Sequence, residues 1–358
     1  MDFVWLLVGL AVLTVGAEIL VRGASAFALA MKISPLVVGL TVVAFGTSAP
    51  ELVVSLQSAL RAQADLAVGN VVGSNIFNVL FILGVSALIV PLVVSQQLVR
   101  LEVPVLIALS AAVWGMAADG HLVRYEGIFL VGGLILYTGW TIRSSRKENA
   151  AVVEEYQQEF STTAASPIGK RLLVQLGMIA AGLLLLVLGA RLLSDAAVSI
   201  ARQLGVSELA IGLTIVAAGT SLPEVATSIL AAIRGERDIA VGNVVGSNLF
   251  NILGVLGLSS TLAGDVPVPA AALGFDLPVM TAVTLACLPI FWTGHAIARW
   301  EGALFLCYYV LYVSYLFLSS EQSTWLGPMR TLTWTIVIPL TLFTLLASGL
   351  THVRKAKE

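Results

Sequence analysis

One stretch of 46 residues occurs twice in this chain, at a fixed offset of 173 positions. Residues 39–84 read GLTVVAFGTSAPELVVSLQSALRAQADLAVGNVVGSNIFNVLFILG, and residues 212–257 read GLTIVAAGTSLPEVATSILAAIRGERDIAVGNVVGSNLFNILGVLG. The two copies are identical at 28 of these 46 positions, without a gap. An internal repeat of this kind constrains the whole architecture. Each copy also places Thr, Ser, Glu and Asn among apolar residues, where polar groups are costly and usually bind something.

The composition is that of a membrane protein. Of 358 residues, 58% are hydrophobic and 11% are charged, whereas a soluble domain has about 45–50% apolar and about 25% charged residues. The two cysteines, Cys287 and Cys307, lie in apolar segments and indicate neither a disulfide framework nor a metal site. Nucleic-acid binding is excluded as a function because the sequence has no basic patch to support it.

Eleven apolar segments are long enough to cross a hydrocarbon core, which takes about 20 helical residues. The longest polar interval, 143–171, separates the fifth segment from the sixth and is predicted to be a linker outside the bilayer. The predicted spans are 3–21, 35–60, 66–91, 101–118, 124–142, 172–193, 208–233, 239–262, 275–293, 299–318 and 332–350.

The basic residues predict the orientation, because cytoplasmic loops carry an excess of Lys and Arg. With the N-terminus outside, 14 of the 19 basic residues fall on the cytoplasmic side and 5 on the outer side. We therefore expect an outside N-terminus and a cytoplasmic C-terminus. The expected location is the inner (cell) membrane of a bacterium or an archaeon.

The repeat extends beyond the 46 residues. Gly16-Ala17 matches Gly189-Ala190, and Arg124-Tyr125-Glu126-Gly127 resembles Arg299-Trp300-Glu301-Gly302. Each copy thus belongs to a unit of five predicted spans. Because five is odd, the second unit enters from the opposite side, which is typical of secondary transporters with a site between their halves.

The predicted fold is an all-α polytopic membrane protein with two inverted-topology repeats of five transmembrane helices plus one extra C-terminal helix. We expect the parts to be the first repeat at 1–142, a cytoplasmic linker at 143–171, the second repeat at 172–320, and an eleventh helix with a cytoplasmic tail at 321–358.

Each copy contains a predicted helix break beside a carboxylate. Pro50 lacks an amide hydrogen and Gly46 loosens the same turn, so a helix should break or kink within residues 46–51. Such a break frees carbonyl oxygens, for example that of Ala44, to face a cation. Thr47 and Ser48 lie four and three residues before Glu51, so their oxygens can share one face of the helix.

The pooled side chains predict a site for a hard cation. The following helix of the first copy offers Ser74 and Asn78 on one face, and the second copy repeats every one of these groups. Oxygen ligands without Cys or His suit calcium, and sodium accepts the same oxygens. The Gly69-xxx-Gly73 and Gly242-xxx-Gly246 spacings also predict close helix packing, which does not exclude a nearby site.

At these residues the chain resembles the cation/calcium exchanger superfamily, in particular the prokaryotic sodium/calcium exchangers. The motifs G-T-S-x-P-E and G-N-x-x-G-S-N-x-x-N/D of that family both stand here twice. The resemblance covers the first ten predicted helices and implies a central group of helices 2, 3, 7 and 8 around the ions, with helices 1 and 6 long and tilted. The ligands that it implies are Ala44, Thr47, Ser48, Glu51, Ser74, Asn78, Ala217, Thr220, Ser221, Glu224, Ser247 and Asn251.

One departure from the family pattern concerns charge. Many relatives carry Asp at one or both positions held here by Asn78 and Asn251, so this site has only the carboxylates of Glu51 and Glu224. Two negative charges balance one Ca²⁺ but leave three Na⁺ with one excess positive charge. The stoichiometry and the use of potassium or protons therefore stay open.

The predicted function is a secondary-active antiporter that exchanges sodium for calcium, with no cofactor, no enzymatic activity and no obligate protein partner. The ions and the lipid bilayer are its expected partners. A proton/calcium or potassium-dependent exchanger is the alternative, because a desolvated Glu can take up a proton. An intramembrane hydrolase would need an activated nucleophile, and a passive channel would need weaker, multi-site binding.

Overall fold

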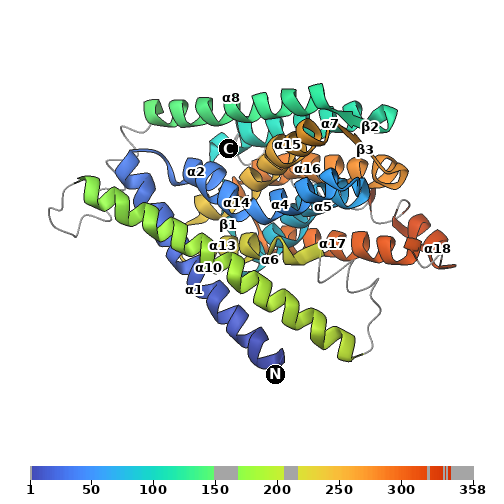
Figure 1. Cartoon of the computed structure of the whole chain (residues 1–358), viewed down its shortest axis with the longest axis horizontal. Coiled ribbons are helices and arrows are strands. Elements are labelled where there is room, and N and C mark those ends of the chain that lie inside the picture. The colour runs from blue at the N-terminus through green and yellow to red at the C-terminus, as the bar shows by residue number, and fades with distance from the viewer. Residues whose placement is uncertain are drawn as a thin grey trace, which may run out of the picture.

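The protein is a helical polytopic membrane protein, as the sequence predicts. Within the described residues, eight helices are long and apolar enough to span a membrane (Figure 1). Pro35–Thr47 and Ala49–Leu60 form a ninth candidate, bent by 48° at its break. The computed structural model describes residues 2–148, 168–204, 217–320, 323–333, 335 and 338–339.

The elements of the two halves follow one another in the same order. The first half contains α1 (Asp2–Met31), α2 (Pro35–Val38), η1 (Gly39–Val43), α3 (Ala44–Thr47), α4 (Ala49–Leu60), α5 (Ala64–Phe77), η2 (Asn78–Leu83), α6 (Gly84–Ile89), β1 (Leu92–Val93), η3 (Leu98–Glu102), α7 (Val103–Met116), η4 (Ala117–Asp119), β2 (His121–Val123) and α8 (Arg124–Glu148). The second half contains α10 (Ile168–Gln203), α12 (Ala217–Gly219), α13 (Leu222–Ile233), α14 (Arg237–Phe250), η6 (Asn251–Leu256), α15 (Gly257–Ala263), β3 (Asp265–Pro267), η7 (Ala272–Asp276), α16 (Leu277–Trp292), β4 (Ala296–Ile297) and α17 (Arg299–Ser320), and α18 (Leu326–Leu332) follows it.

The helices beside the predicted linker are longer than their apolar segments. Helix α8 continues to Glu148 and helix α10 begins at Ile168, so both enter the interval 143–171. A helix satisfies its backbone hydrogen bonds internally and can therefore continue past an apolar span. Most of the predicted last span, 332–350, and the first part of 208–233 lie outside the described residues.

Two short antiparallel ladders join the halves. Strand β1 pairs with β4 through Leu92 and Ile297, and β2 pairs with β3 through Leu122 and Val266. By the repeat, β1 corresponds to β3 and β2 to β4, so each ladder contains one strand from each half. The symmetry of the sequence repeat is therefore also present in the pairing of the strands.

Helices α1 and α10 pack closely along one another at a slant to the other helices (Figure 1). Their contact depends on glycines at the seven-residue spacing Gly9, Gly16 and Gly23. A Cβ atom on Gly16 would lie 2.8 Å from the amide nitrogen of Leu186 and 3.0 Å from the carbonyl oxygen of Gly182. Small residues allow this approach of two membrane helices.

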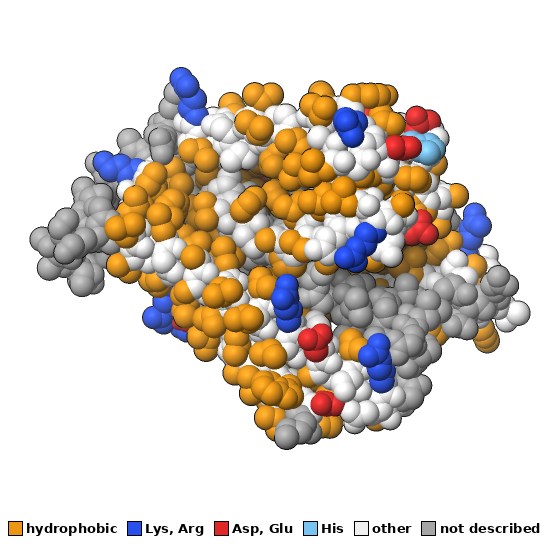
Figure 2. Space-filling view, viewed as in Figure 1, with side chains coloured by type: hydrophobic (Ala, Val, Ile, Leu, Met, Phe, Trp, Pro, Cys, Tyr) orange, Lys and Arg blue, Asp and Glu red, His pale blue; other side chains and the backbone are white. Residues whose placement is uncertain are grey.

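Helix α14 lies at the centre of the molecule. The apolar window of Arg237–Ala263 is 100% buried, against 33% for that of Asp2–Met31. A Cβ atom on Gly246 would lie 2.6 Å from the backbone of Leu40, so the predicted packing role of Gly242-xxx-Gly246 is confirmed by its contacts with α2 and η1. The same prediction for Gly69-xxx-Gly73 is wrong, because a Cβ atom on either glycine would have no other atom within 4 Å. Hydrophobic side chains cover much of the outer face that Figure 2 shows, as expected of a surface in lipid.

Candidate cation-binding site

The two predicted helix breaks occur at serines. Ser48 and Ser221 precede α4 and α13 with ψ values of 8° and 7°, outside the helical range. Each following helix carries its proline in the first turn, where the missing amide hydrogen is not needed. Glu51 and Glu224 thus also lie in the first turn of a helix, where the helix dipole favours a negative charge.

The two halves hold each other's carboxylates. The hydroxyl of Ser48 donates to Oε1 of Glu224 at 2.8 Å, and the hydroxyl of Ser221 donates to Oε1 of Glu51 at 2.8 Å. The Ser221 hydroxyl also lies 3.3 Å from that of Ser74. The break residues are therefore brought together across the repeat.

The second oxygen of each carboxylate is left without a hydrogen bond. Glu51 and Glu224 are 0% and 1% exposed, and Oε2 of each has no hydrogen-bond partner among the described residues. The two carboxylates also act on each other electrostatically. Buried charges are costly unless they are paired or bind a metal, and a cation bound to these oxygens would offset that cost.

Two site asparagines present unpartnered oxygens as well. The amide nitrogen of Asn78 donates to Oδ1 of Asn248 at 3.0 Å, and that of Asn251 donates to Oδ1 of Asn75 at 3.1 Å. Within the described ranges, Oδ1 of Asn78 and Oδ1 of Asn251 accept no hydrogen bond. Each asparagine therefore keeps its acceptor free while its donor is occupied.

Asn75 and Asn248 position these amides, although the sequence analysis did not single them out. The amide of Asn75 donates to the backbone oxygen of Asn248 at 3.3 Å, and the amide of Asn248 donates to that of Asn75 at 3.2 Å. These backbone contacts fix the direction of both side chains. The sequence did contain a signal for these two residues, because each is the Asn of the G-S-N motif and the motif occurs in both copies of the repeat.

Two of these asparagines also stand at a change of helix type. Asn78 and Asn251 are the first residues of the π-helical segments η2 and η6. Such segments are rare and occur often at functional sites. The apolar sequence of these segments gave no signal for them.

The two threonines lie beside a second pair of asparagines. Thr47 donates to Oδ1 of Asn243 at 3.1 Å, and Thr220 to Oδ1 of Asn70 at 3.5 Å. The amide of Asn70 in turn donates to the hydroxyl of Ser55 at 2.8 Å. The structure therefore directs both threonine hydroxyls across the repeat.

The break does not release the carbonyl oxygen of Ala44, contrary to the expectation from the sequence. This oxygen accepts the amide of Ser48 at 3.0 Å and the hydroxyl of Thr47 at 3.4 Å. The reason is that the helix continues up to Ser48, and Pro50 removes only the amide that would pair with the carbonyl of Gly46, four residues earlier. The corresponding residue of the second copy, Ala217, opens α12, and its side chain lies outside the described residues.

The site is made of oxygen atoms. Ser74 and Ser247 are 3% and 0% exposed and lie on the same helices as the amides. In the described part of the chain, no group of three or more His, Cys, Asp or Glu side chains could hold a metal ion. Any cation here would therefore be held by two carboxylates completed by hydroxyl and amide oxygens, which suits a hard cation.

Comparison with known proteins shows that this chain is similar to ion exchangers. A family model described as sodium/calcium exchanger protein matches residues 1–143 and 174–318. The chain is 40% identical over 322 residues to a putative antiporter, CaxA, of Alkalimonas amylolytica, covering 88% of this chain and 98% of the relative. It is 32% identical over 346 residues to the sodium/calcium exchanger MaX1 of Methanosarcina acetivorans, with coverage of 88% and 98%.

Solved structures agree with these relatives. A structure of the sodium-calcium exchanger NCX_Mj soaked without Na⁺ and Ca²⁺ matches with a TM-score of 0.75 and 30% identity, over 88% of this chain and 98% of that chain. A second structure of the same exchanger, soaked with Na⁺ but no Ca²⁺, matches with a TM-score of 0.74 and 29% identity, over 87% of this chain and 98% of that chain.

Proposed function

The chain belongs to the sodium/calcium exchanger protein family, and on that premise we propose that it exchanges sodium for calcium across a membrane. Sodium entering down its gradient would expel calcium through one site, near the middle of the membrane, to which both halves contribute. The relatives are transporters rather than enzymes. They are membrane proteins, and their structures contain single chains.

One observation carries the proposal. Four buried side chains, Glu51 and Asn78 from one half and Glu224 and Asn251 from the other, each have an oxygen without a hydrogen-bond partner among the described residues. All four atoms are acceptors. A set of buried acceptors without donors is costly unless a cation occupies it.

The charge of the site supports coupled exchange. Two ionised carboxylates balance one Ca²⁺ or two Na⁺, so both loaded states are far less costly to enclose than the empty site. The serine, threonine and asparagine oxygens complete the shell of either ion. Only a site that holds Ca²⁺ or Na⁺ would then switch from opening on one side of the membrane to opening on the other. This restriction couples the calcium flux to the sodium flux.

The remaining sequence predictions complete this proposal. The halves 1–142 and 172–320 would form the inverted repeats that alternate access to the site. The cytoplasmic linker at 143–171 and the eleventh helix within 321–358 would lie outside that core. The N-terminus would face outward, in an inner membrane of bacterial or archaeal type.

The test is calcium uptake into proteoliposomes. An outward sodium gradient should drive uptake of radiolabelled calcium, and collapse of that gradient should stop it. Potassium and proton gradients, imposed in parallel, should not replace the sodium gradient. Steady single-channel currents, or uptake that ignores sodium, would contradict the proposal.

A proton/calcium exchanger is the second candidate function. The observation in its favour is that Oε2 of Glu51 and Oε2 of Glu224 are buried and unpartnered in the described structure, so a proton could neutralise each carboxylate in place of a sodium ion. A jump in sodium concentration at fixed pH separates the candidates. Calcium movement after that jump requires sodium coupling, whereas movement only after a pH jump requires proton coupling.

A further inference from the structure

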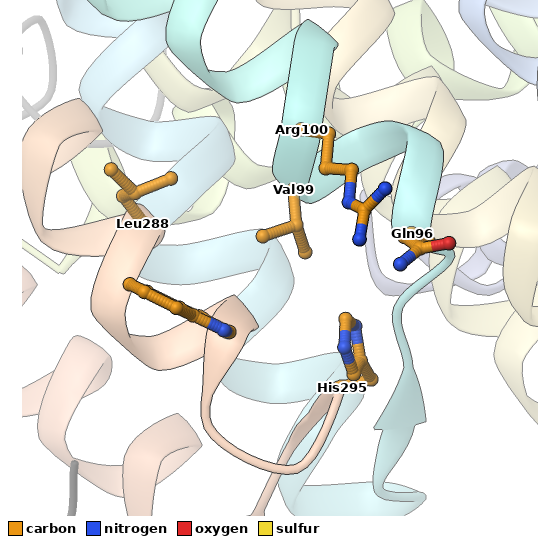
Figure 3. Close-up of a pocket in the computed structure, with 6 residues that line it drawn as sticks. Gln96, Val99, Arg100, Leu288 and His295 are labelled. Atoms are coloured by element: carbon orange, nitrogen blue, oxygen red, sulfur yellow. The ribbon is translucent and has the colours of Figure 1, made fainter. Parts of the chain in front are cut away.

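A pocket with one polar side lies far from the carboxylates along the sequence, where η3 meets the end of α16. Its volume is about 280 Å³. Figure 3 shows Gln96, Arg100 and His295 around one opening, with Val99 and Leu288 on its other side. Trp292, the last residue of α16, completes the lining.

The polar side of this pocket is cationic. None of its lining residues is acidic, and Arg100 forms no ion pair within the described residues. In the amide orientation that satisfies both groups, the oxygen of Gln96 accepts from Nη2 of Arg100 at 2.7 Å and from Nε at 3.2 Å. This contact holds the guanidinium in place and leaves its Nη1 donors for a ligand.

His295 is held in the pocket by a strained backbone. Its φ is +48°, which is uncommon for a residue other than glycine. Its carbonyl oxygen accepts the amide of Val94 at 2.8 Å, next to the β1–β4 ladder. Either tautomer of an imidazole offers an N–H donor, so Arg100 and His295 can both donate to one anion.

The apolar side of the pocket opens toward lipid. Leu285, Leu288 and Trp292 lie three and four residues apart and therefore share one face of α16. Leu285 is 53% exposed and Trp292 is 62% exposed. A tryptophan at the end of a membrane helix is typical of the headgroup level.

The corresponding place in the other ladder is not cationic. At an offset of 174, Gly274 stands where the first half has Arg100, and His121 corresponds to His295. His121 lies 3.0 Å from Oδ1 of Asp265, so a carboxylate faces its ring. The cationic pocket therefore occurs at one of the two equivalent positions, on the side that the basic residues predict to be cytoplasmic.

We propose that this pocket binds the headgroup phosphate of an anionic phospholipid, with Arg100 and His295 as donors and with Leu285, Leu288 and Trp292 beside its acyl chains. Basic pockets between membrane helices on the cytoplasmic side bind anionic headgroups. A bound lipid would join η3 to α16 across the halves. The inference does not depend on which ions the protein transports.

Native mass spectrometry of the full chain in a neutral detergent tests this site. Phosphatidylglycerol is titrated against the wild type and against Arg100→Gln and His295→Asn, since Asn tolerates a positive φ. Each variant should bind phosphatidylglycerol about fivefold more weakly, as expected for the loss of one hydrogen-bond donor to the headgroup phosphate. Phosphatidylcholine should bind more weakly than phosphatidylglycerol to the wild type and equally to all chains.

Two control variants each remove one hydrogen-bond donor elsewhere in the protein. Arg143→Gln changes an exposed arginine on the same predicted side, and His121→Asn changes the histidine of the other ladder. Both should bind phosphatidylglycerol as the wild type does. Arg100→Lys keeps a cation and should retain most of the affinity, which tests the site if Arg100→Gln does not fold.

Three results would overturn the proposal. The pocket variants could bind phosphatidylglycerol as tightly as the wild type does. Arg143→Gln could weaken binding to the same extent, which would assign the effect to surface charge in general. Glycerol 3-phosphate could displace the lipid at equal concentration, which would make the ligand a free phosphate rather than a lipid.

Discussion

The hydroxyl of Ser48 donates to Oε1 of Glu224 at 2.8 Å, across 176 positions of the chain. Its counterpart, from Ser221 to Glu51, has the same length. Each half therefore orients the carboxylate that the other half supplies. A relative movement of the halves would break both hydrogen bonds together, which links the shape of the site to the conformation of the whole protein.

Removal of either charge should abolish transport. Glu51→Gln and Glu224→Gln keep the shape of the side chain, but each replaces one oxygen with an amide donor. Loss of one partner of a buried ion pair costs about 3–5 kcal/mol, so calcium affinity should fall by more than about a hundredfold. Sodium-driven calcium uptake into proteoliposomes measures this.

The control for these variants is Asp65→Asn, which removes an exposed carboxylate in the first turn of α5. It should leave uptake unchanged. Wild-type flux in either glutamate variant would refute the assignment of that glutamate to the site.

Loss of the crossed hydrogen bonds should weaken calcium binding equally in the two halves. Ser48→Ala and Ser221→Ala each leave a carboxylate oxygen without its donor. A hydrogen bond to a charged group contributes about 1.5–3 kcal/mol, so each variant should bind calcium at least about tenfold more weakly. Equilibrium binding of calcium to the purified protein measures this.

Ser86→Ala is the matched control for the serine variants. Ser86 is also buried, and its hydroxyl has no partner in the described residues, but it lies on α6, outside the proposed site. The Ser86→Ala variant should bind calcium with the affinity of the wild type. A large loss in one site serine with none in the other would contradict the symmetric arrangement.

Asn248 should affect calcium binding through Asn78. Asn248→Ala removes the acceptor of the Asn78 amide, so that amide can rotate and present its NH₂ group to the cation. Calcium affinity should fall by about tenfold. The double variant with Asn78→Ala tests the mechanism, because coupled residues are not additive.

In the Asn78→Ala background, Asn248→Ala should cause little further loss of calcium affinity. If the two losses simply add, Asn248 does not act by positioning Asn78. The same comparison applies to Asn75 and Asn251, which form the equivalent pair.

The contact between α1 and α10 should not tolerate a methyl group at Gly16. A Cβ atom there would lie within 3.0 Å of the backbone of α10, and overpacking of this kind costs about 1–3 kcal/mol. Gly16→Ala should therefore lower the melting temperature of the purified protein. The control is Gly177→Ala, on α10 at a position with open space, which should leave the melting temperature unchanged or raise it. An equal fall in melting temperature in both variants would contradict the packing argument.

The membrane fold and the family could be predicted because both depend on local patterns. Apolar length predicts spans, and the repeat with its four motif copies predicts the family resemblance, which the comparisons confirm. Pro50 and Pro223 predicted helix breaks at the right places, since proline cannot complete a helical turn. The structure bends the first of these by 48°.

Other features could not be read from those patterns. The π-helical segments η2 and η6 are apolar after their first residue, an asparagine, and an apolar sequence does not distinguish a π-helix from an α-helix. The roles of Asn75 and Asn248 depend on backbone atoms of the opposite half, which a search for cation ligands does not consider. The carbonyl of Ala44 remained hydrogen-bonded because the amide of Ser48, which lies before the break, pairs with it.

By itself, the sequence determined that this chain is a membrane protein with a duplicated acidic motif, because hydrophobicity and repetition are properties of the chain alone. Only the tertiary structure decided which oxygens keep a free lone pair, and that the serine of one half holds the glutamate of the other. Those are contacts between residues about 170 positions apart, and they exist only when both halves are packed around the same point.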